Sequence, residues 1–514
     1  MKKKWVKKVL YALFIVLCTT LVFGSMYVKK IYPKVLFDEL FFYLFNGVTH
    51  ADNSLIIEGV KFALPFIVIS SIVLYVILSK LFISTYLLKK VKKEKYVNII
   101  RIVLSIILLL VSIYVLMINL NVIDYIKSQT ETSNFISKNY VDPKTANIKF
   151  PDKKRNLIII FVESLETSMF TKEQGGYWNY EVVPELYELL NDEDVTVFYN
   201  DNKTELMEQL DLSSWTTGGD VANTSGLPLK IPIQRSSYHS SNFMQGAYSL
   251  GDVLKENGYY NEYISSARTS FGGLKEYFTK HGGYNILDIN SYANYQLSIS
   301  KRDVSDWGFN DNYLFEIAKK RLKVLANRDK PFNLILQTID THYRDGYIEW
   351  YSKDSYDTQY ENVYATESEL IYNFVKWLKE QDFYENTTIM IVGDHISMQE
   401  DYFRSRGAWK RYIYNCYINA YNKAENTSGR IYTAFDSYPT LLSSIGVKIE
   451  GDRLGLGVNL FSPRKTLSEE YGFDYFNEEL NKKSSFYNSV ILGEDYDKMD
   501  AKIKAKEEKN KKAE

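Results

Sequence analysis

The 514-residue chain has few of the residues that build disulfide frameworks or cysteine metal centres, with two cysteines in all, Cys18 and Cys416. Cys18 lies inside a long apolar run and Cys416 in a run typical of a strand, so we expect no disulfide between them. Two cysteines are also too few for a cysteine-based metal site. The net charge of −1 provides no excess of positive charge, so nucleic acid is not an expected partner.

Long apolar runs, in contrast, are concentrated near the N-terminus. Three of them reach the length of about 20 residues that a helix needs to cross a bilayer. They cover approximately residues 9–28, 62–83 and 99–118. The first is longer than the apolar part of a typical signal peptide and lacks an A-x-A-like cleavage site, so we expect it to be retained. Residues 1–120 are therefore predicted to form a membrane domain with three transmembrane helices.

Lysine clusters predict the orientation of these helices. MKKKWVKK precedes the first apolar run, and LLKKVKKEK separates the second from the third. Cytoplasmic segments carry an excess of lysine and arginine, so both clusters are expected inside the cell. Lys29, Lys30 and Lys34, after the first run, oppose this assignment mildly. We predict a multi-pass protein of the cell membrane whose chain is extracellular from about Asn121 onward.

The remainder of the chain alternates between strand-like and helical patterns. Residues 121–155 are polar and irregular and are predicted to be a linker. The segments NLIIIFVE, NLILQTID and TTIMIVGDH contain continuous apolar runs typical of strands buried on both faces of a parallel sheet. Because helical patterns such as NYLFEIAKKRLKVLAN separate them, we predict an α/β domain with a mainly parallel sheet over residues 156–465. Residues 466–514 form a C-terminal extension with a charged tail.

Polar residues follow these apolar runs where each strand would end. Glu163 follows the first run, the DTH sequence with His342 follows the second, and Asp394 and His395 follow the third. The carboxyl ends of parallel strands form the usual site edge of such sheets, so we expect these side chains to converge. A carboxylate beside an imidazole suits Zn²⁺ or Mn²⁺, and His342 could bind a phosphate oxygen or protonate a leaving group. Taken singly, each motif is equally well explained by a solvated strand end, a capped turn or a hydrogen-bonded loop histidine.

A hydroxyl-rich segment, LDLSSWTTGGDVANTSGLP, occupies residues 210–228. A serine or threonine nucleophile needs activation, which coordination to a divalent metal supplies. Small neighbouring residues would let a phosphate approach backbone amides at a helix N-terminus. A polar loop followed by a helix cap explains the same composition without chemistry.

The order of these motifs resembles the lipoteichoic acid synthases and, more closely, the phosphoglycerol transferases that modify osmoregulated periplasmic glucans. These families have a sulfatase domain of the alkaline-phosphatase superfamily, and the resemblance covers roughly residues 156–461. Seven motifs in one order are more specific than any single motif. They are VESLE, SSWTTGGDVANTSGLP, GDVLKENGY, DWGFNDN, DTHYRDGY, GDHISM and LGLG.

This resemblance implies a metal site and a fold. It implies an α/β alkaline-phosphatase-like (sulfatase) domain after the transmembrane helices. The expected metal ligands are Glu163, Asp394 and His395 together with the nucleophile, and His342 matches a contact to the phosphoglycerol group. Mn²⁺ is the expected ion, with Mg²⁺ and Zn²⁺ as alternatives.

The nucleophile has two candidates in the same segment. Counting back from the Gly-Leu-Pro sequence places the family's threonine at Ser213, which we prefer on this register and which would then also be a metal ligand. Residue type favours Thr216 instead, because the related families use threonine. Single alanine substitutions at Ser213, Thr216 and Thr217 would separate these alternatives.

The reaction implied by the resemblance moves glycerophosphate from a phosphatidylglycerol-type lipid donor to an extracellular glycan, glycolipid or teichoic-acid-type acceptor. It proceeds through a covalent serine or threonine intermediate. A phosphoethanolamine transferase, a sulfuric ester hydrolase and a catalytically inactive membrane sensor remain as alternatives. The segment SSWTT lacks the proline or alanine and the arginine of a formylglycine motif, which disfavours the hydrolase. Binding of a divalent metal would disfavour the inactive sensor.

Overall fold

The structure is a computed structural model, and it divides into two compact units between Lys127 and Ser128. Each unit is described here by itself. The structure describes residues 2–31, 37, 40, 53–79, 82–84, 94–230, 243–270, 272–291, 304 and 308–493.

The first unit contains three long helices, which confirms the prediction of three N-terminal apolar helices. Each is long and apolar enough to cross a membrane by length and composition. Apolar side chains such as Ile69 and Leu110 are exposed along them, as expected of surfaces that contact lipid. The second helix begins before the predicted run of residues 62–83, because the preceding segment NSLIIEGVK is also helical, and it ends at Ile77, before the end of that run. The three helices are α1 (Lys2–Ile31), α3 (Asn53–Ile77) and α5 (Glu94–Asn119).

The second unit is built on a seven-stranded sheet with the order β3-β8-β7-β2-β6-β4-β5. The strands from β7 to β5 are parallel, and β8 and β3 are added antiparallel at one edge. This confirms the predicted mainly parallel sheet, with β2 at its centre. The strands are β2 (Asn156–Val162), β3 (Val195–Thr196), β4 (Tyr260–Ser265), β5 (Asn285–Leu287), β6 (Phe332–Gln337), β7 (Thr387–Gly393) and β8 (Asn415–Ile418).

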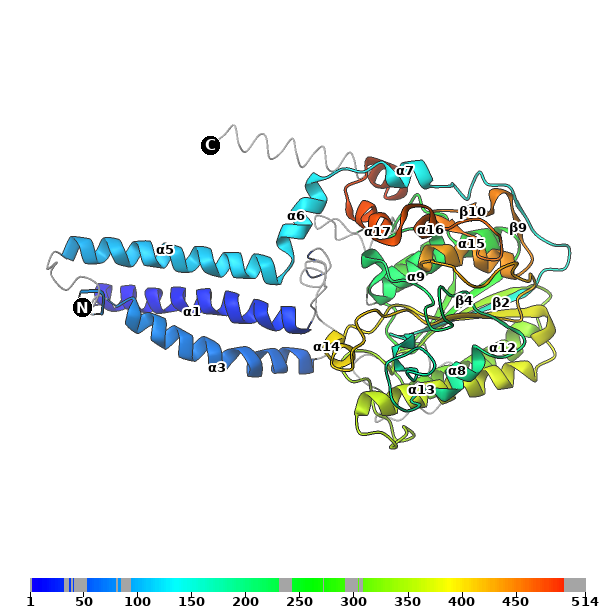
Figure 1. Ribbon diagram of the computed structural model, residues 1–514, viewed down its shortest axis with the longest axis horizontal. Coiled ribbons are helices and arrows are strands. Elements are labelled where there is room, and N and C mark those ends of the chain that lie inside the picture. The colour runs from blue at the N-terminus through cyan, green and yellow to red at the C-terminus, as the bar shows by residue number, and fades with distance from the viewer. Residues whose placement is uncertain are drawn as a thin grey trace. The chain divides into compact units, whose positions relative to one another are not determined.

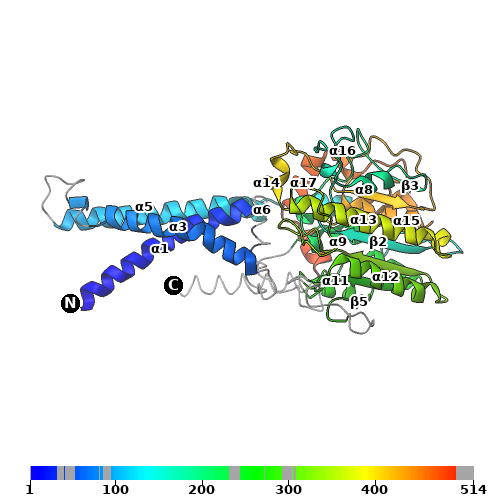
Figure 2. The same ribbon diagram turned by 90° about the horizontal axis from the view of Figure 1, so that it is seen from below.

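Helices cover both faces of this sheet, which explains why all seven residues of β2 are buried. Figure 1 shows α9 (Thr216–Ser225) and α15 (Ala434–Ser444) on one face. On the other face lie α8 (Pro184–Leu189), α12 (Asp311–Ala326) and α13 (Gln359–Lys379), as Figures 1 and 2 show. The apolar runs thus form the central layer of a three-layer α/β domain.

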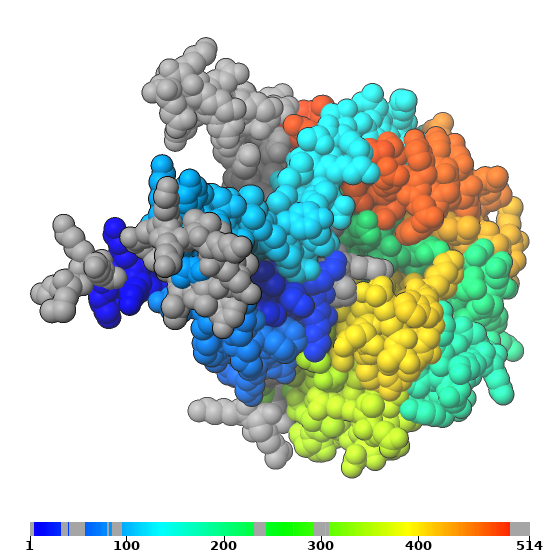
Figure 3. All heavy atoms as spheres, turned by 60° about the vertical axis from the view of Figure 1, so that its left-hand side comes forward, coloured from blue at the N-terminus to red at the C-terminus, as the bar shows by residue number. Residues whose placement is uncertain are grey.

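The predicted linker and C-terminal extension both contain ordered structure. Phe135 packs edge-on against Tyr471, with ring centroids 5.1 Å apart, and Tyr487 donates a hydrogen bond of 2.5 Å to the Pro228 carbonyl oxygen. Figure 3 shows the orange-red C-terminal helices beside the cyan segment that contains α7. The charged tail after residue 493 lies outside the described residues. The elements are α6 (Val122–Thr130), α7 (Phe135–Asn139), β1 (Ile148–Lys149), α16 (Leu467–Tyr471), α17 (Phe473–Asn481) and a π-helix (Tyr487–Ile491).

Candidate active site

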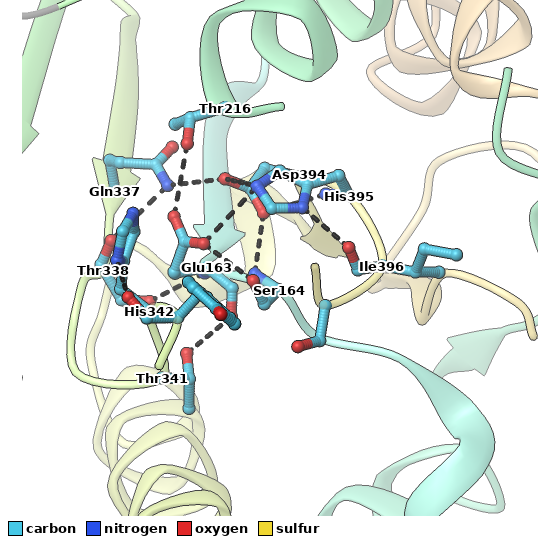
Figure 4. A network of polar contacts seen from close by, with 12 residues as sticks. Glu163, Ser164, Thr216, Gln337, Thr338, Thr341, His342, Asp394, His395 and Ile396 are labelled. Atoms are coloured by element: carbon cyan, nitrogen blue, oxygen red, sulfur yellow. Dashed lines mark hydrogen bonds and ion pairs between the residues drawn. The ribbon is translucent and has the colours of Figure 1, made fainter. Parts of the chain in front are cut away.

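Three predicted site residues meet at the carboxyl edge of the sheet. Glu163 directly follows β2, and Asp394 and His395 directly follow β7. These two strands are parallel neighbours, and their last residues, Val162 and Gly393, are in register. Ligand atoms of the three side chains therefore lie within 4.8 Å of one another, and all three residues are buried (Figure 4).

Ser164 holds the two carboxylates in place. Its backbone N–H donates to Asp394 Oδ1 at 2.8 Å, and its hydroxyl donates to Glu163 Oε1 at 2.7 Å. Ser164 makes both hydrogen bonds with a backbone φ of 55°, a left-handed conformation that non-glycine residues rarely adopt. Such conformations cluster at functional sites. Ser164 was not singled out from the sequence, although it lies within the VESLE motif.

His395 presents one ring nitrogen to both carboxylates. Its Nδ1 lies 2.8 Å from the Ile396 carbonyl oxygen, so Nδ1 is the donor, and Nε2 is the nitrogen left for a metal ion. Its Nε2 then faces Glu163 Oε1 at 3.4 Å and Asp394 Oδ2 at 3.7 Å. A backbone acceptor on the remote nitrogen is the usual support of a metal-ligating histidine. Two carboxylates and this nitrogen therefore fit a divalent ion that accepts mixed nitrogen and oxygen ligands.

The electrostatics of the three groups also favour a cation. Burial raises the pKa of Asp394, and the neighbouring Glu163 carboxylate adds to this, giving about 7. Burial lowers the pKa of His395, but the two carboxylates outweigh it and raise the pKa to about 10. Burial raises the pKa of Glu163, yet His395 and His342 together bring it to about 2. The buried carboxylates thus depend on positive charge beside them.

Thr216 is the hydroxyl residue that the structure brings to this cluster. It is the first residue of α9, is half-buried, and its Oγ1 donates to Glu163 Oε2 at 3.2 Å (Figure 4). Ser213 lies in the preceding 3₁₀ turn, where its hydroxyl donates to the Leu210 carbonyl oxygen at 3.1 Å. Ser213 and Thr216 both remain candidates for the nucleophile, and the contact with Glu163 is the reason that Thr216 is preferred in the proposal below. Counting residues back from Gly-Leu-Pro could not show that the 3₁₀ turn ends at Ser213 and that α9 begins at Thr216.

His342 lies on the loop that follows β6, close enough for its charge to lower the pKa of Glu163. Its Nδ1 lies 2.6 Å from the Tyr343 carbonyl oxygen. The loop is tied to the site by Thr341, whose hydroxyl donates to the Glu163 carbonyl oxygen at 2.5 Å. The structure therefore places every predicted site residue except Ser213 around one centre.

Comparison with known proteins identifies the family of the domain that contains this centre. Residues 155–447 match the family described as Sulfatase, which is more than half of the chain. The chain belongs to the sulfatase family. Phosphoglycerol transferase I of Escherichia coli K12 is 30% identical over 270 residues, which is 51% of this chain and 32% of that protein. The chain thus spans about a third of the length of the curated relatives it matches.

Two solved structures that align with this chain have TM-scores below 0.5. A lipoteichoic acid synthase from Listeria monocytogenes aligns with a TM-score of 0.45 at 16% identity, covering 64% of this chain and 80% of that one. The lipooligosaccharide phosphoethanolamine transferase A of Neisseria meningitidis aligns with a TM-score of 0.48 at 12% identity, covering 86% and 84%.

The sulfatase domain of this chain supports its centre with a buried ion pair between Glu166 and Arg411. Glu166 Oε2 also accepts the Ser397 N–H at 3.0 Å, and Arg411 Nη2 donates to the Ser397 carbonyl oxygen at 2.6 Å. The Glu166–Arg411 pair therefore holds both the N–H and the carbonyl group of Ser397, two positions after His395. Sequence reasoning missed this pair, because its partners are 245 positions apart.

The start of α9 packs directly on the strand end that carries Asp394. A Cβ atom at Gly219 would lie 2.1 Å from the Asp394 carbonyl oxygen, so only glycine allows this approach. The close contact fixes the helix that carries Thr216 against the loop that carries Asp394. The first backbone N–H groups of a helix are unsatisfied within it and attract anions, so the start of α9 suits a phosphate beside Thr216.

Proposed function

We propose that this protein is a metal-dependent phosphoglycerol transferase of the membrane. In this proposal it moves glycerophosphate from a phosphatidylglycerol-type lipid to an extracellular glycan or teichoic-acid-type acceptor. The observation that carries the proposal is the Thr216 hydroxyl, which donates to Glu163 beside Asp394 and His395. A hydroxyl at a cluster of metal ligands is the arrangement needed for an activated oxygen nucleophile.

Glu163, Asp394 and His395 would hold the divalent ion, and Mn²⁺ remains our expected choice. When bound, the ion would favour the ionised form of the nucleophile and neutralise charge on the phosphoryl group. Ser164 keeps the two carboxylates oriented through its two hydrogen bonds. Thr216 is the proposed nucleophile.

In the first half-reaction a bond forms between Thr216 Oγ1 and phosphorus as the bond from phosphorus to the diacylglycerol oxygen breaks. The proton that Thr216 gives up ends on the released diacylglycerol hydroxyl. The amides at the start of α9 bind the phosphoryl oxygens, and His342 contacts the transferred group. In the second half-reaction an acceptor hydroxyl attacks phosphorus, Thr216 leaves, and the acceptor's proton returns to Thr216.

The three apolar helices support a lipid donor, since an enzyme held at the membrane meets a lipid substrate at its surface. The lysine clusters at the N-terminus and between the second and third apolar runs support an extracellular catalytic domain. A glycan or teichoic-acid-type acceptor outside the cell is consistent with this orientation.

The test is turnover by the purified full-length chain with Mn²⁺ and a panel of donors. We expect diacylglycerol release from fluorescent phosphatidylglycerol, loss of that release in Thr216→Ala, and its retention in Ser213→Ala. The panel includes phosphatidylethanolamine and a nitrophenyl sulfate. Turnover of one of these in place of phosphatidylglycerol would overturn the proposed donor, and full activity of Thr216→Ala would overturn the proposed nucleophile.

A further inference from the structure

A second group of buried carboxyl side chains lies outside the centre just described. Asp311 is the first residue of α12, Asp340 follows β6, and Glu367 lies in the middle of α13. Their ligand oxygens lie within 4.8 Å of one another, and all three residues are buried. The proposed mechanism uses none of them.

Two of these carboxyl groups are anchored by hydrogen bonds. Asp311 accepts the backbone N–H groups of Ile339 and Asp340, at 2.9 Å and 2.6 Å, and the hydroxyl of Ser266 at 2.5 Å. Asp340 Oδ2 accepts the Asp311 N–H at 3.0 Å and the Tyr351 hydroxyl at 2.9 Å. These donors hold both carboxyl groups in fixed positions and lower their pKa values, but burial outweighs them, raising the pKa of Asp311 to about 7 and that of Asp340 well above its usual range.

Glu367 differs, because no group donates a hydrogen bond to its carboxyl oxygens among the described residues. It is 1% exposed, and among the described residues neither of its carboxyl oxygens has a hydrogen-bond partner. A buried carboxyl without a partner is costly and rare in folded proteins. Glu367 lies on α13, whereas Asp311 lies on α12. A carboxyl oxygen of Glu367 lies within 4.8 Å of carboxyl oxygens of both Asp311 and Asp340.

The charge balance around these three carboxyl groups is negative among the described ion pairs. In the part of the chain that the structure describes, no lysine or arginine forms an ion pair with any of the three. Burial raises the pKa of Glu367 well above its usual range, and Asp311 and Asp340 raise it further. Three buried carboxyl groups at one point therefore require either shared protons or a bound cation.

We propose that Asp311, Asp340 and Glu367 form a second cation site, which binds Ca²⁺. The geometry supports this, because two oxygens bound to one Ca²⁺ at 2.3–2.6 Å are separated by at most about 5 Å. The ligands are oxygen atoms alone, which suits a hard cation and not an ion that prefers imidazole. Ca²⁺ tolerates an irregular arrangement of two anchored side chains and Glu367, whereas Mg²⁺ requires near-octahedral geometry.

Such an ion would join three elements that position the transferase centre. It would tie α12 and α13 to the loop after β6, and this loop carries His342 two residues beyond Asp340. The same loop is bonded to the Glu163 carbonyl oxygen through Thr341. The second site thus binds a structural cation that holds the loop after β6, which carries His342. This ion is distinct from the one that Glu163 and Asp394 would bind.

The test measures metal content per full-length chain after dialysis against Ca²⁺ and Mn²⁺ together, by elemental mass spectrometry. We expect two ions on the wild type, one Mn²⁺ and one Ca²⁺. Glu367→Gln should lose the Ca²⁺ and keep the Mn²⁺, and Asp394→Asn should do the reverse. Glu369→Gln is the matched control, because the same change on the same helix affects a side chain that is 51% exposed, and it should keep both ions.

Hydrogen exchange supplies an independent measurement. Removal of Ca²⁺ should increase exchange at residues 338–342 in the wild type but not in Glu367→Gln. A wild type that holds no Ca²⁺, or a Glu367→Gln variant with unchanged Ca²⁺ content, would overturn the site. Either result would mean that the three carboxyl groups share protons instead.

Discussion

The contact between α9 and the strand end that carries Asp394 provides a sharp test through Gly219→Ala. The added Cβ would lie 2.1 Å from the Asp394 carbonyl oxygen, whereas ordinary contact begins at 3.4 Å, so the two backbones must separate by roughly 1.3 Å. The substitution creates no charge and removes no hydrogen-bonding group. Its effect on catalysis therefore comes from displacement alone.

The expected magnitude follows from this displacement. Overpacking of this kind costs about 1–3 kcal/mol of stability, offset by up to about 1 kcal/mol from replacing a helical glycine with alanine. A misplacement of about 1 Å at a reacting group costs on the order of 100-fold in rate. We therefore expect Gly219→Ala to remain folded while the release of diacylglycerol from phosphatidylglycerol falls about 100-fold.

Gly218→Ala is the matched control on the same helix. Its closest contact would be the Trp215 side chain at 2.7 Å, not the backbone of the strand end, so we expect a smaller loss of rate. Initial rates and melting temperatures of both variants would be compared with the wild type. A Gly219→Ala enzyme within threefold of the wild-type rate would refute the tight coupling between α9 and Asp394.

Three further predictions concern the metal ligands, the buried ion pair and the topology. Asp394→Asn and His395→Ala should each lose bound Mn²⁺ and transferase activity while circular dichroism stays unchanged; wild-type turnover in either would contradict the ligand assignment. Glu166→Gln should lower stability by about 3–5 kcal/mol, because it leaves Arg411 buried without its partner, and an unchanged melting temperature would show that the clamp is dispensable. A secreted-phosphatase reporter fused after residue 127 should be active outside the cell, and an inactive but well expressed fusion would refute the orientation.

The meeting of Glu163 with Asp394 and His395 was predictable from sequence because the apolar pattern fixes where strands end. Glu163 and Asp394 each follow a continuous apolar run, and parallel pairing brings such ends together whatever the rest of the fold does. The choice between Ser213 and Thr216 depends on where a helix begins, which the hydroxyl-rich sequence does not reveal. Residue type, which comes from the family resemblance, favours Thr216, and the hydroxyl contact of Thr216 with Glu163 is consistent with it.

Long-range pairings explain what sequence reasoning missed. Glu166 and Arg411 meet only because separate loops converge, and no periodic pattern marks either residue. Glu367 lies on an amphipathic helix, where a glutamate is expected on the solvated face, yet its side chain is buried. Ser164 has a left-handed backbone that only the finished site explains.

Trapping the covalent intermediate would show whether Thr216 carries the transferred group. The full-length enzyme would be incubated with Mn²⁺ and phosphatidylglycerol without an acceptor, then quenched, digested and analysed by mass spectrometry. We predict a glycerophosphoryl adduct on Thr216 that is absent without Mn²⁺ and absent in Thr216→Ala, but present in Ser213→Ala. An adduct on Ser213, or on any peptide outside residues 210–228, would contradict the account.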